Sequence, residues 1–173
     1  VFFSLINAYG STQKIKKSGG KENSMRTEKG VAIIAYKEKR GKKRFLVLQR
    51  TKNWEGWELP KGHLEQDDYS HTAKLELREE AGIPEEDIEE QDQLDAVLEW
   101  SYEDEEDDEK VKREYQAYLI KVSEDALVDV SNNPHDEHKN GFFMKQEDVE
   151  SLLTYDNQKE LLQKAVTLMK SEG

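Results

Sequence analysis

Continuous apolar runs occupy two neighbouring stretches of the chain, residues 30–36 (GVAIIAY) and residues 44–50 (RFLVLQR). A short basic segment containing Gly41 joins them, so this region predicts a β-hairpin with Gly41 in its turn. The acidic residues 103–109 (EDEEDDE) predict a solvated connecting loop. Three further stretches predict strands, namely residues 94–100 (LDAVLEW), 114–122 (EYQAYLIKV) and 141–145 (GFFMK).

Helical spacing of apolar residues replaces the strand pattern in two other regions. From about Tyr69 to Ala81 the pattern is helical, and it stops at Gly82, the residue type favoured just past a helix end. Between about Glu147 and Lys170 apolar residues again recur at helical intervals. Strands alternating with helices predict an α/β (α+β) fold, with a mixed sheet on which helices pack.

The length of 173 residues suits one domain with a short extension. We assign residues 1–28 to an N-terminal extension and residues 29–173 to the domain, and Met25 is a candidate natural start. The extension begins with an apolar run followed by Ser, Gly and Lys, which is typical of a targeting presequence, and the alternatives are a flexible tail, a leader or an additional edge element. No stretch approaches the roughly 18 consecutive apolar residues of a membrane span, so we expect no membrane association.

The composition excludes some classes of protein. The chain has no cysteine, which excludes disulfides and Cys-ligated zinc, and we expect an intracellular, cytoplasmic protein, with a mitochondrial location as the alternative. The formal net charge of −12 argues against strong nucleic-acid binding, because that affinity comes largely from Lys and Arg on phosphates. A small phosphate-rich substrate is still compatible, since bound divalent cations reverse the sign of an acidic site.

Three glutamates stand close together in the predicted helix, at Glu76, Glu79 and Glu80. Their i, i+3 and i+4 spacing places all three on one helical face, while Ala73 and Leu77 can face the core. Like charges at this spacing cost a helix about 0.2–0.5 kcal/mol per pair. One interpretation is an ordinary solvated acidic face. The other is a divalent-cation site, since Mg²⁺ takes oxygen ligands and bridges to substrate phosphates.

The residues before the helix favour the cation site. Lys61 provides a positive charge for a phosphate, and Gly62 permits close approach of the backbone. The whole segment, residues 60–83 (PKGHLEQDDYSHTAKLELREEAGI), resembles the Nudix box. This resemblance implies a Nudix α/β/α sandwich that hydrolyses a nucleoside diphosphate linked to another group, with Mg²⁺ as cofactor and Mn²⁺ as an alternative ion. It also implies that the three helical glutamates are metal ligands, with Glu79 or Glu80 as general base.

Two departures from the Nudix pattern lie in the box itself. The loop before the helix is one residue short, so that Asp67 or Asp68 stands where the pattern has a glutamate. Leu75 replaces the arginine that orients and neutralises the glutamates in the family. Lys74 lies about 100° round the helix from that position and is an imperfect substitute, while Arg78 lies one turn further on. These departures place the catalytic strength of the site in question, but not the fold.

Features outside the box resemble the asymmetric diadenosine tetraphosphate hydrolases. The turn before the helix is similar, and in that branch a tyrosine after the box stacks on a base while a basic residue before the next strand binds phosphate. An acidic residue beside a histidine, followed by an aromatic strand, is also shared. The resemblance therefore assigns substrate-binding roles to Lys61, His63, Tyr102, Lys112 or Arg113, Phe142 and Phe143, and a further metal-ligand role to Glu137.

Each of these assignments has a structural alternative. Phe142 and Phe143 alternate along a strand, so one packs in the core and only the other can face a ligand. Tyr102 can equally be an ordinary loop aromatic, and His63 and His138 can be polar loop residues. The histidine pair around the proposed extra metal ligand also admits a zinc site, as the lesser alternative.

The leading hypothesis for function is Mg²⁺-dependent hydrolysis of diadenosine tetraphosphate to ATP and AMP, by attack of water on phosphorus. A second hypothesis keeps the same machinery for another diphosphate, which would be a nucleoside triphosphate, an mRNA cap or an inositol pyrophosphate. A third hypothesis is a non-catalytic Nudix-fold module that binds a nucleotide, which Leu75 and the shortened loop support. Turnover on a panel of these substrates separates the enzymatic hypotheses from the binding one.

Overall fold

The computed structural model describes residues 25–172 of the chain. Its strands are β1 (Met25–Lys39), β2 (Lys42–Arg50), β3 (Gly56–Glu58), β4 (Lys61–His63), β5 (Ile88–Asp104), β6 (Glu109–Val122) and β7 (His138–Met144). Its helices are α1 (Tyr69–Ala81), α2 (Gln146–Leu152) and α3 (Asp156–Ser171), with a short 3-10 turn at Glu85–Asp87. Most of the predicted extension lies outside the described residues. Its expected boundary after residue 28 falls inside β1, which begins at Met25.

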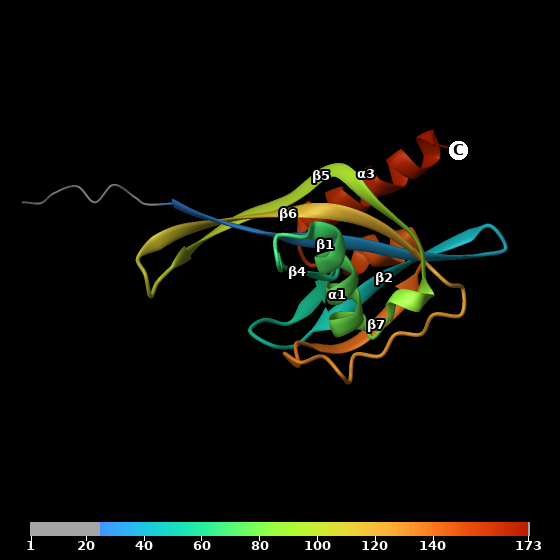
Figure 1. The fold of residues 1–173 in the computed structure, drawn as a ribbon, viewed down its shortest axis with the longest axis horizontal. Helices are drawn as coiled ribbons and strands as arrows, with labels where there is room; N and C mark the ends of the chain where they lie inside the picture. Colours follow the sequence, from blue (N-terminus) through green and yellow to red (C-terminus); the bar gives the residue numbers. More distant parts are fainter. Residues whose placement is uncertain (1–24, 173) are drawn as a thin grey trace, which may run out of the picture.

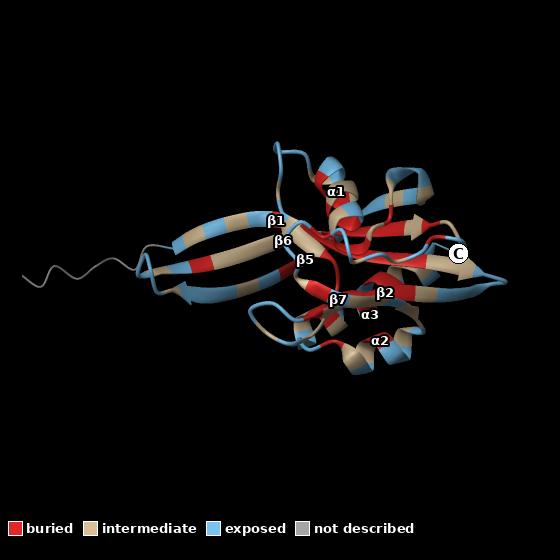
Figure 2. Ribbon diagram, turned by 90° about the horizontal axis from the view of Figure 1, so that it is seen from below, coloured by how far each residue is buried: buried red, intermediate tan, exposed pale blue. Residues whose placement is uncertain are grey.

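The strands form one mixed sheet in the order β3-β2-β1-β6-β5, to which β4 adds beside β1 and β7 beside β2. Strands β1 and β6 run parallel, whereas the other pairs are antiparallel. Helix α1 covers one face of the sheet, and α2 and α3 cover the other (Figure 1; Figure 2). A separate apolar core lies on each face. The predicted mixed sheet between helices is therefore confirmed.

Local sequence determines the ends of α1. Asp68 is the N-cap, and its side chain accepts a hydrogen bond from the backbone N–H of His71 at 2.9 Å. At the other end Gly82 has a left-handed φ of 68° and donates its backbone N–H to the carbonyl of Arg78. The predicted helix therefore begins and ends where the sequence indicates. The predicted hairpin is also present, with Gly41 in its turn at a φ of 72°.

The acidic segment 103–109 differs from its prediction. Strand β5 continues to Asp104 and β6 begins at Glu109, so only a tight turn at residues 105–108 remains. The start of β1, the end of β5 and the start of β6 form a three-stranded extension that projects from the body of the molecule (Figure 2). We call this extension the arm. Backbone pairing explains the difference, because β6 pairs with β5 as far as Asp104 and with the start of β1 on its other side, while Arg26 adds contacts with Asp104 at 3.3 Å and Glu109 at 2.9 Å. A loop interpretation missed these strands because the start of β1 lies in a distant part of the chain.

Strand β1 changes its partner along its length, and this opens the sheet. Residues 36–39 of β1 pair with β2, whereas residues 30–32 pair with β4. Between them the backbone N–H of Ile33 donates to the carbonyl of Pro60 at 2.8 Å. The segment that connects β3 to β4 therefore lies where the sheet divides, next to the acidic face of α1. No helix among residues 25–172 is long and apolar enough to cross a lipid bilayer.

Candidate active site

The glutamates of α1 lie beneath this opening and are largely buried. Glu76 is 9% exposed and Glu80 is 6% exposed, while Glu79 is partly exposed. Ala73 and Leu77 are fully buried in the core on the other side of the helix, as the spacing predicts. A solvated acidic face would leave the glutamates in water, so that interpretation is wrong for two of the three.

Gly62 in β4 allows α1 to approach this closely. A Cβ atom added at Gly62 would overlap the carboxyl group of Glu76. Glu80, which lies on the same face of α1, also contacts β4. Its Oε2 atom accepts a hydrogen bond from the backbone N–H of Lys61 at 3.0 Å. The Lys-Gly turn thus holds both buried carboxyl groups at the edge of β4 with backbone contacts.

Burial makes these carboxyl groups hard to ionise without a counter-charge. Burial raises the pKa of Glu76 to about 8, and the nearby Glu79, Glu65 and Glu137 contribute. The pKa of Glu80 is also raised well above its ordinary value, by burial first and then by Glu58 and Glu76. Lys61 lowers both pKa values but does not cancel the effect. A cluster of oxygen donors with this electrostatic character fits a hard divalent cation such as Mg²⁺.

Glu58, which ends β3, is a site residue that the sequence analysis missed. Its side chain is fully buried, and burial alone would raise its pKa. The hydrogen bond from His138 and the charges of Lys61 and Arg50 instead bring the pKa of Glu58 down to about 2. One indication was available in the sequence, because Glu58 stands between the apolar Trp57 and Leu59, just before Pro60. Arg50 and Lys61 are close to Glu58 in the sequence, but its third partner, His138, lies 80 residues away.

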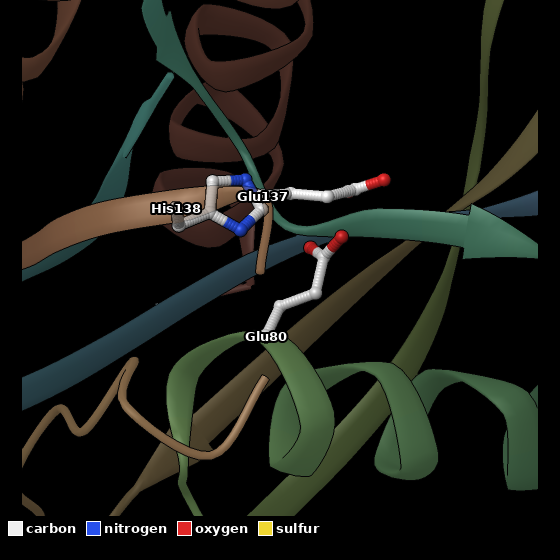
Figure 3. A group of neighbouring side chains, drawn as sticks. All are labelled: Glu80, Glu137 and His138. Atoms are coloured by element: carbon white, nitrogen blue, oxygen red, sulfur yellow. The ribbon is translucent and has the colours of Figure 1, made fainter. Parts of the chain in front are cut away.

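Glu137 reaches the glutamates of α1 from the start of β7. Ligand atoms of Glu80, Glu137 and His138 all lie within 4.8 Å of one another, and Figure 3 shows Glu80 rising from α1 toward the other two. Oε2 of Glu137 accepts a hydrogen bond from Nη1 of Arg50 at 3.3 Å. The structure therefore brings together two of the carboxylates predicted as metal ligands from separate elements.

A cleft of about 620 Å³ lies beside Arg50 and Lys61. Aromatic side chains from three separate segments contribute to its walls. Trp54 and Tyr155 meet edge to face with their ring centroids 5.1 Å apart. The cleft is lined by Arg50, Asn53, Trp54, Lys61, Trp100, Ser101, Tyr102, Arg113, Tyr155, Asn157 and Gln158. Lys61, Tyr102 and Arg113 are among the substrate residues predicted from the sequence, whereas Trp54, Trp100 and Tyr155 are not.

The alternation of β6 separates the two basic residues predicted to bind phosphate. Arg113 lines the cleft, where its guanidinium lies 5.1 Å from the ring of Tyr102 and donates to the Tyr102 hydroxyl at 3.2 Å. Lys112 belongs to the opposite face of the sheet and forms ion pairs with Glu114 at 2.8 Å and with Glu99 at 3.5 Å. Of the two alternatives, only Arg113 lies where a substrate in the cleft could contact it.

Three other predicted substrate residues lie outside the lining of this cleft. His63 has its Nδ1 atom 3.1 Å from the hydroxyl of the buried Tyr115, and burial followed by the charge of Arg113 lowers the pKa of His63. Phe143 packs toward the core beneath α1, with Nζ of Lys37 4.7 Å from its ring centroid. Phe142 is 44% exposed. The predicted alternation of the two phenylalanines is therefore present, but the exposed ring lies away from the cleft lining.

The two departures from the Nudix pattern have clear local consequences. Lys74 forms an ion pair with Glu85 at 2.6 Å. It therefore does not take the role of the arginine that Leu75 replaces. In the shortened loop, Gln66 and Asp67 both have a left-handed φ of 53°. Asp68 then serves as the N-cap of α1. Asp67 and Asp68, which stand where the pattern has its isolated glutamate, therefore form the turn and the N-cap at the start of α1.

Comparison with known proteins places this site in context. The chain matches the family profile described as the NUDIX domain over residues 26–165. No curated protein matches the sequence significantly. An Ap4A hydrolase of C. elegans in a binary complex is similar in structure, with a TM-score of 0.60 at 24% identity over 83% of this chain and 98% of that one. A NUDIX hydrolase from Listeria monocytogenes has a TM-score of 0.63 at 22% identity, over 83% of this chain and 94% of that one.

A third similar structure contains a bound nucleotide derivative. The NUDIX domain of Shewanella oneidensis NrtR, complexed with ADP ribose, has a TM-score of 0.61 at 13% identity. It aligns with 83% of this chain and 88% of that one. At identities this low, the three structures establish a shared fold, and the residues described above must carry any statement about chemistry.

Proposed function

Because the chain belongs to the Nudix hydrolase family, whose domain profile matches residues 26–165, we propose that it hydrolyses a nucleoside polyphosphate, with diadenosine tetraphosphate as substrate and ATP and AMP as products. One observation carries this proposal. The buried Glu80 accepts a hydrogen bond from Lys61, and Lys61 lines a cleft that combines aromatic walls with the cations Arg50, Lys61 and Arg113. Rings suit bases and cations suit the connecting phosphates.

The size and lining of the cleft support a nucleotide rather than a small anion. A volume of about 620 Å³ lies within the range of about 300–1,000 Å³ typical of small-molecule sites. Two aromatic groups, Trp54 with Tyr155 and Trp100 with Tyr102, offer more than one ring surface to a ligand with two bases. This arrangement favours a dinucleoside polyphosphate over an inositol pyrophosphate, which has no base to stack.

The proposed reaction is attack of water on a phosphorus atom of the polyphosphate chain. Mg²⁺ held by Glu76, Glu79, Glu80 and Glu137 would polarise phosphoryl oxygens and lower the pKa of the attacking water. Glu79 or Glu80 accepts the proton that the water loses, and the departing nucleotide takes the bridging oxygen. Lys61 and Arg113 neutralise charge on the phosphates, and Tyr102 positions a base. Mn²⁺ is an alternative ion, because it also takes carboxylate ligands.

The proposal is tested by product analysis in ¹⁸O-labelled water. The purified protein is incubated with Mg²⁺ and diadenosine tetraphosphate, nucleoside triphosphates, nucleotide sugars, capped RNA or inositol pyrophosphates. We expect ATP and AMP from the first substrate, with one ¹⁸O atom in one of the two products. Two molecules of ADP would contradict asymmetric cleavage. Absence of Mg²⁺-dependent turnover on every substrate would favour the alternative of a nucleotide-binding module, which Leu75 suggests.

A further inference from the structure

A buried chain of polar side chains runs from His138 toward the candidate metal ligands. Glu58, His138 and Arg50 are each at least nine-tenths buried. Nε2 of His138 lies 2.8 Å from Oε1 of Glu58, and the same oxygen accepts a hydrogen bond from Nη1 of Arg50 at 2.9 Å. Nη1 of Arg50 also donates to Glu137 at 3.3 Å. These contacts connect a histidine to a predicted metal ligand through two intervening side chains.

The neighbours of His138 determine which ring nitrogen bears the proton. The side-chain oxygen of Asn133 accepts the backbone N–H of His135 at 2.9 Å. The amide nitrogen of Asn133 is therefore the atom that faces Nδ1 of His138, at 3.2 Å. An amide nitrogen can only donate, so Nδ1 accepts and the proton of the neutral ring lies on Nε2. His138 thus donates a hydrogen bond to the Glu58 carboxylate.

This tautomer conflicts with a direct role of His138 in metal binding. Distances alone permit such a role, because its ligand atom lies within 4.8 Å of those of Glu80 and Glu137. A metal ion needs a nitrogen lone pair, however, and both ring nitrogens are engaged. Ligation would also remove the hydrogen bond from His138 to Glu58. A buried carboxylate that loses a charge-assisted hydrogen bond is destabilised.

We propose that His138 is a positioning residue of the metal site, which fixes Glu58 so that Glu58 holds Arg50 against Glu137 and Lys61 against Glu80. The second connection is an ion pair on Glu58 rather than a hydrogen bond. Nζ of Lys61 lies 3.1 Å from Oε2 of Glu58, while the backbone N–H of Lys61 donates to Glu80 at 3.0 Å. The inference rests on the proposed function in one respect, namely that Glu80 and Glu137 bind a divalent cation.

The same network supplies positive charge beside the carboxylates, where Leu75 replaces the arginine of the Nudix pattern. Leu75 has no charge, and the neighbouring Lys74 pairs with Glu85. Arg50 and Lys61 instead stand against the carboxylates, and both are oriented by the single buried carboxylate of Glu58. A side chain that orients a ligating carboxylate contributes to metal affinity without touching the metal. His138 lies at the far end of this chain of contacts.

A matched pair of substitutions separates positioning from simple packing. The glutamine of His138→Gln can place a side-chain N–H near the position of Nε2, whereas the shorter side chain of His138→Asn cannot reach Glu58. Mn²⁺ binding is measured by electron paramagnetic resonance on the full chain without substrate. We expect His138→Asn to bind Mn²⁺ about 10- to 100-fold more weakly, and His138→Gln to bind it nearly as well as the original protein. The control is His135→Asn in the same loop, where the side chain is exposed, and its affinity should not change.

A spectroscopic readout distinguishes positioning from ligation. Pulsed paramagnetic resonance of the Mn²⁺ complex should show no coupling from a directly bound imidazole nitrogen, and detection of such coupling overturns the proposal. So does unchanged Mn²⁺ affinity in a folded His138→Asn variant. If that variant does not fold, Arg50→Lys decides, because it keeps the charge but loses the guanidinium geometry. Wild-type affinity in Arg50→Lys then overturns the proposal, and weakened affinity supports it.

The binding measurement keeps this inference separate from the choice of substrate. Because Mn²⁺ is titrated without a nucleotide, failure of the protein to cleave diadenosine tetraphosphate would refute the proposed substrate while the affinities still decide the role of His138. Where turnover occurs, we expect His138→Asn to lower kcat by more than it raises KM, because the aromatic walls of the cleft are untouched and only the cations Arg50 and Lys61 lose their orientation. An increase in KM with unchanged kcat would count against a role in positioning the metal ligands.

Discussion

In the arm, acidic and basic side chains lie opposite one another at the surface, whereas at the sheet opening the acidic side chains are buried together. Arg26 contacts carboxylates from β5 and β6, and Glu114 pairs with both Lys29 and Lys112. At the opening, Glu76 and Glu80 instead share Lys61 with the buried Glu58.

The difference between the two regions explains why charge counts alone are a poor guide to function. The acidic segment of the arm contains more carboxylates in sequence than α1 does, yet three of them share Arg26 from another strand and the segment remains in contact with water. Exposed pairs of this kind contribute little to stability. Buried carboxyl groups with too few cations are costly unless a further cation binds. Burial therefore identifies the site, and the number of acidic residues does not.

The substitution with the largest expected effect is Glu80→Gln, which should lower the catalytic rate. This change keeps the shape of the side chain but removes its negative charge and its capacity to accept a proton. We expect kcat to fall by about 10²–10⁴-fold, with the fold retained. Steady-state kinetics on diadenosine tetraphosphate and circular dichroism provide the measurement. The corresponding arm variant, Glu103→Gln, should leave kcat unchanged, and a comparable loss there would contradict the distinction between the two regions.

The next effect concerns the close approach of β4 to α1. In Gly62→Ala the added methyl group would overlap the carboxyl group of Glu76. We expect a loss of stability of about 1–3 kcal/mol, typical of overpacking, together with reduced kcat. Gly41→Ala is the control, since Gly41 has open space around it and a substitution there is strained only by its positive φ. It should destabilise the hairpin turn without changing kcat, which chemical denaturation and kinetics would test together.

Removal of divalent cations should make stability depend on pH. Burial raises the pKa of Glu76 from 4.5 to about 8 in the folded protein. Between pH 4.5 and about 8, Glu76 holds a proton in the folded state that it releases in the unfolded chain. The free energy of unfolding therefore keeps its full value below about pH 4.5 and decreases as the pH rises through about 8. The change is on the order of a few kcal/mol. It is measured by urea denaturation in EDTA. Glu76→Gln or added Mg²⁺ should reduce the pH dependence, and an equally steep curve with Glu76→Gln would contradict the assignment.

A smaller effect is expected at Tyr102, which lies near the end of β5 and lines the cleft. Stacking of a base on an aromatic ring is worth about 1–3 kcal/mol, so Tyr102→Ala should raise KM by about ten-fold or more with less effect on kcat. Lys112→Ala is the control from the neighbouring strand, because Lys112 belongs to the opposite face of the sheet. Equal increases in KM for both variants would show that the cleft is not the substrate site.

The smallest effect is expected from the arm's ion pairs. Arg26→Ala removes contacts with Asp104 and Glu109, and we expect a slight decrease in Tm. Because exposed pairs are screened by salt, this decrease should disappear at high ionic strength. Differential scanning calorimetry at low and high salt tests it. A large decrease that persists in salt would mean that the arm contributes to the core of the fold.

Sequence predicted the parts of the molecule that depend on neighbouring residues. Helix α1 is bounded by Asp68 and Gly82, whose capping roles are local. The roles that sequence did not provide depend on contacts between distant segments. Glu58 becomes a site residue because His138, which lies 80 residues away in the sequence, meets it in the folded protein.

The choice between Lys112 and Arg113 shows the same limit in a finer form. The two residues are adjacent, so only the orientation of β6 decides which one faces the cleft. That orientation depends on pairing with β1 and β5. The cleft aromatics come from the loop after β2, from β5 and from the loop before α3. No short motif could collect residues from three such places.

The parallel pairing of β1 with β6 has a consequence for the order of folding. Residues 25–36 align with residues 110–121, so every paired position joins segments 85 residues apart. Closing so long a loop before any pairing forms is entropically unfavourable and slows folding. During synthesis β1 must wait until β6 has left the ribosome, although the β1–β2 hairpin can form earlier. Both β4 and the arm pair with β1, so the cleft should assemble last. In refolding, a change in Tyr102 fluorescence or accessibility should therefore lag behind formation of the hairpin.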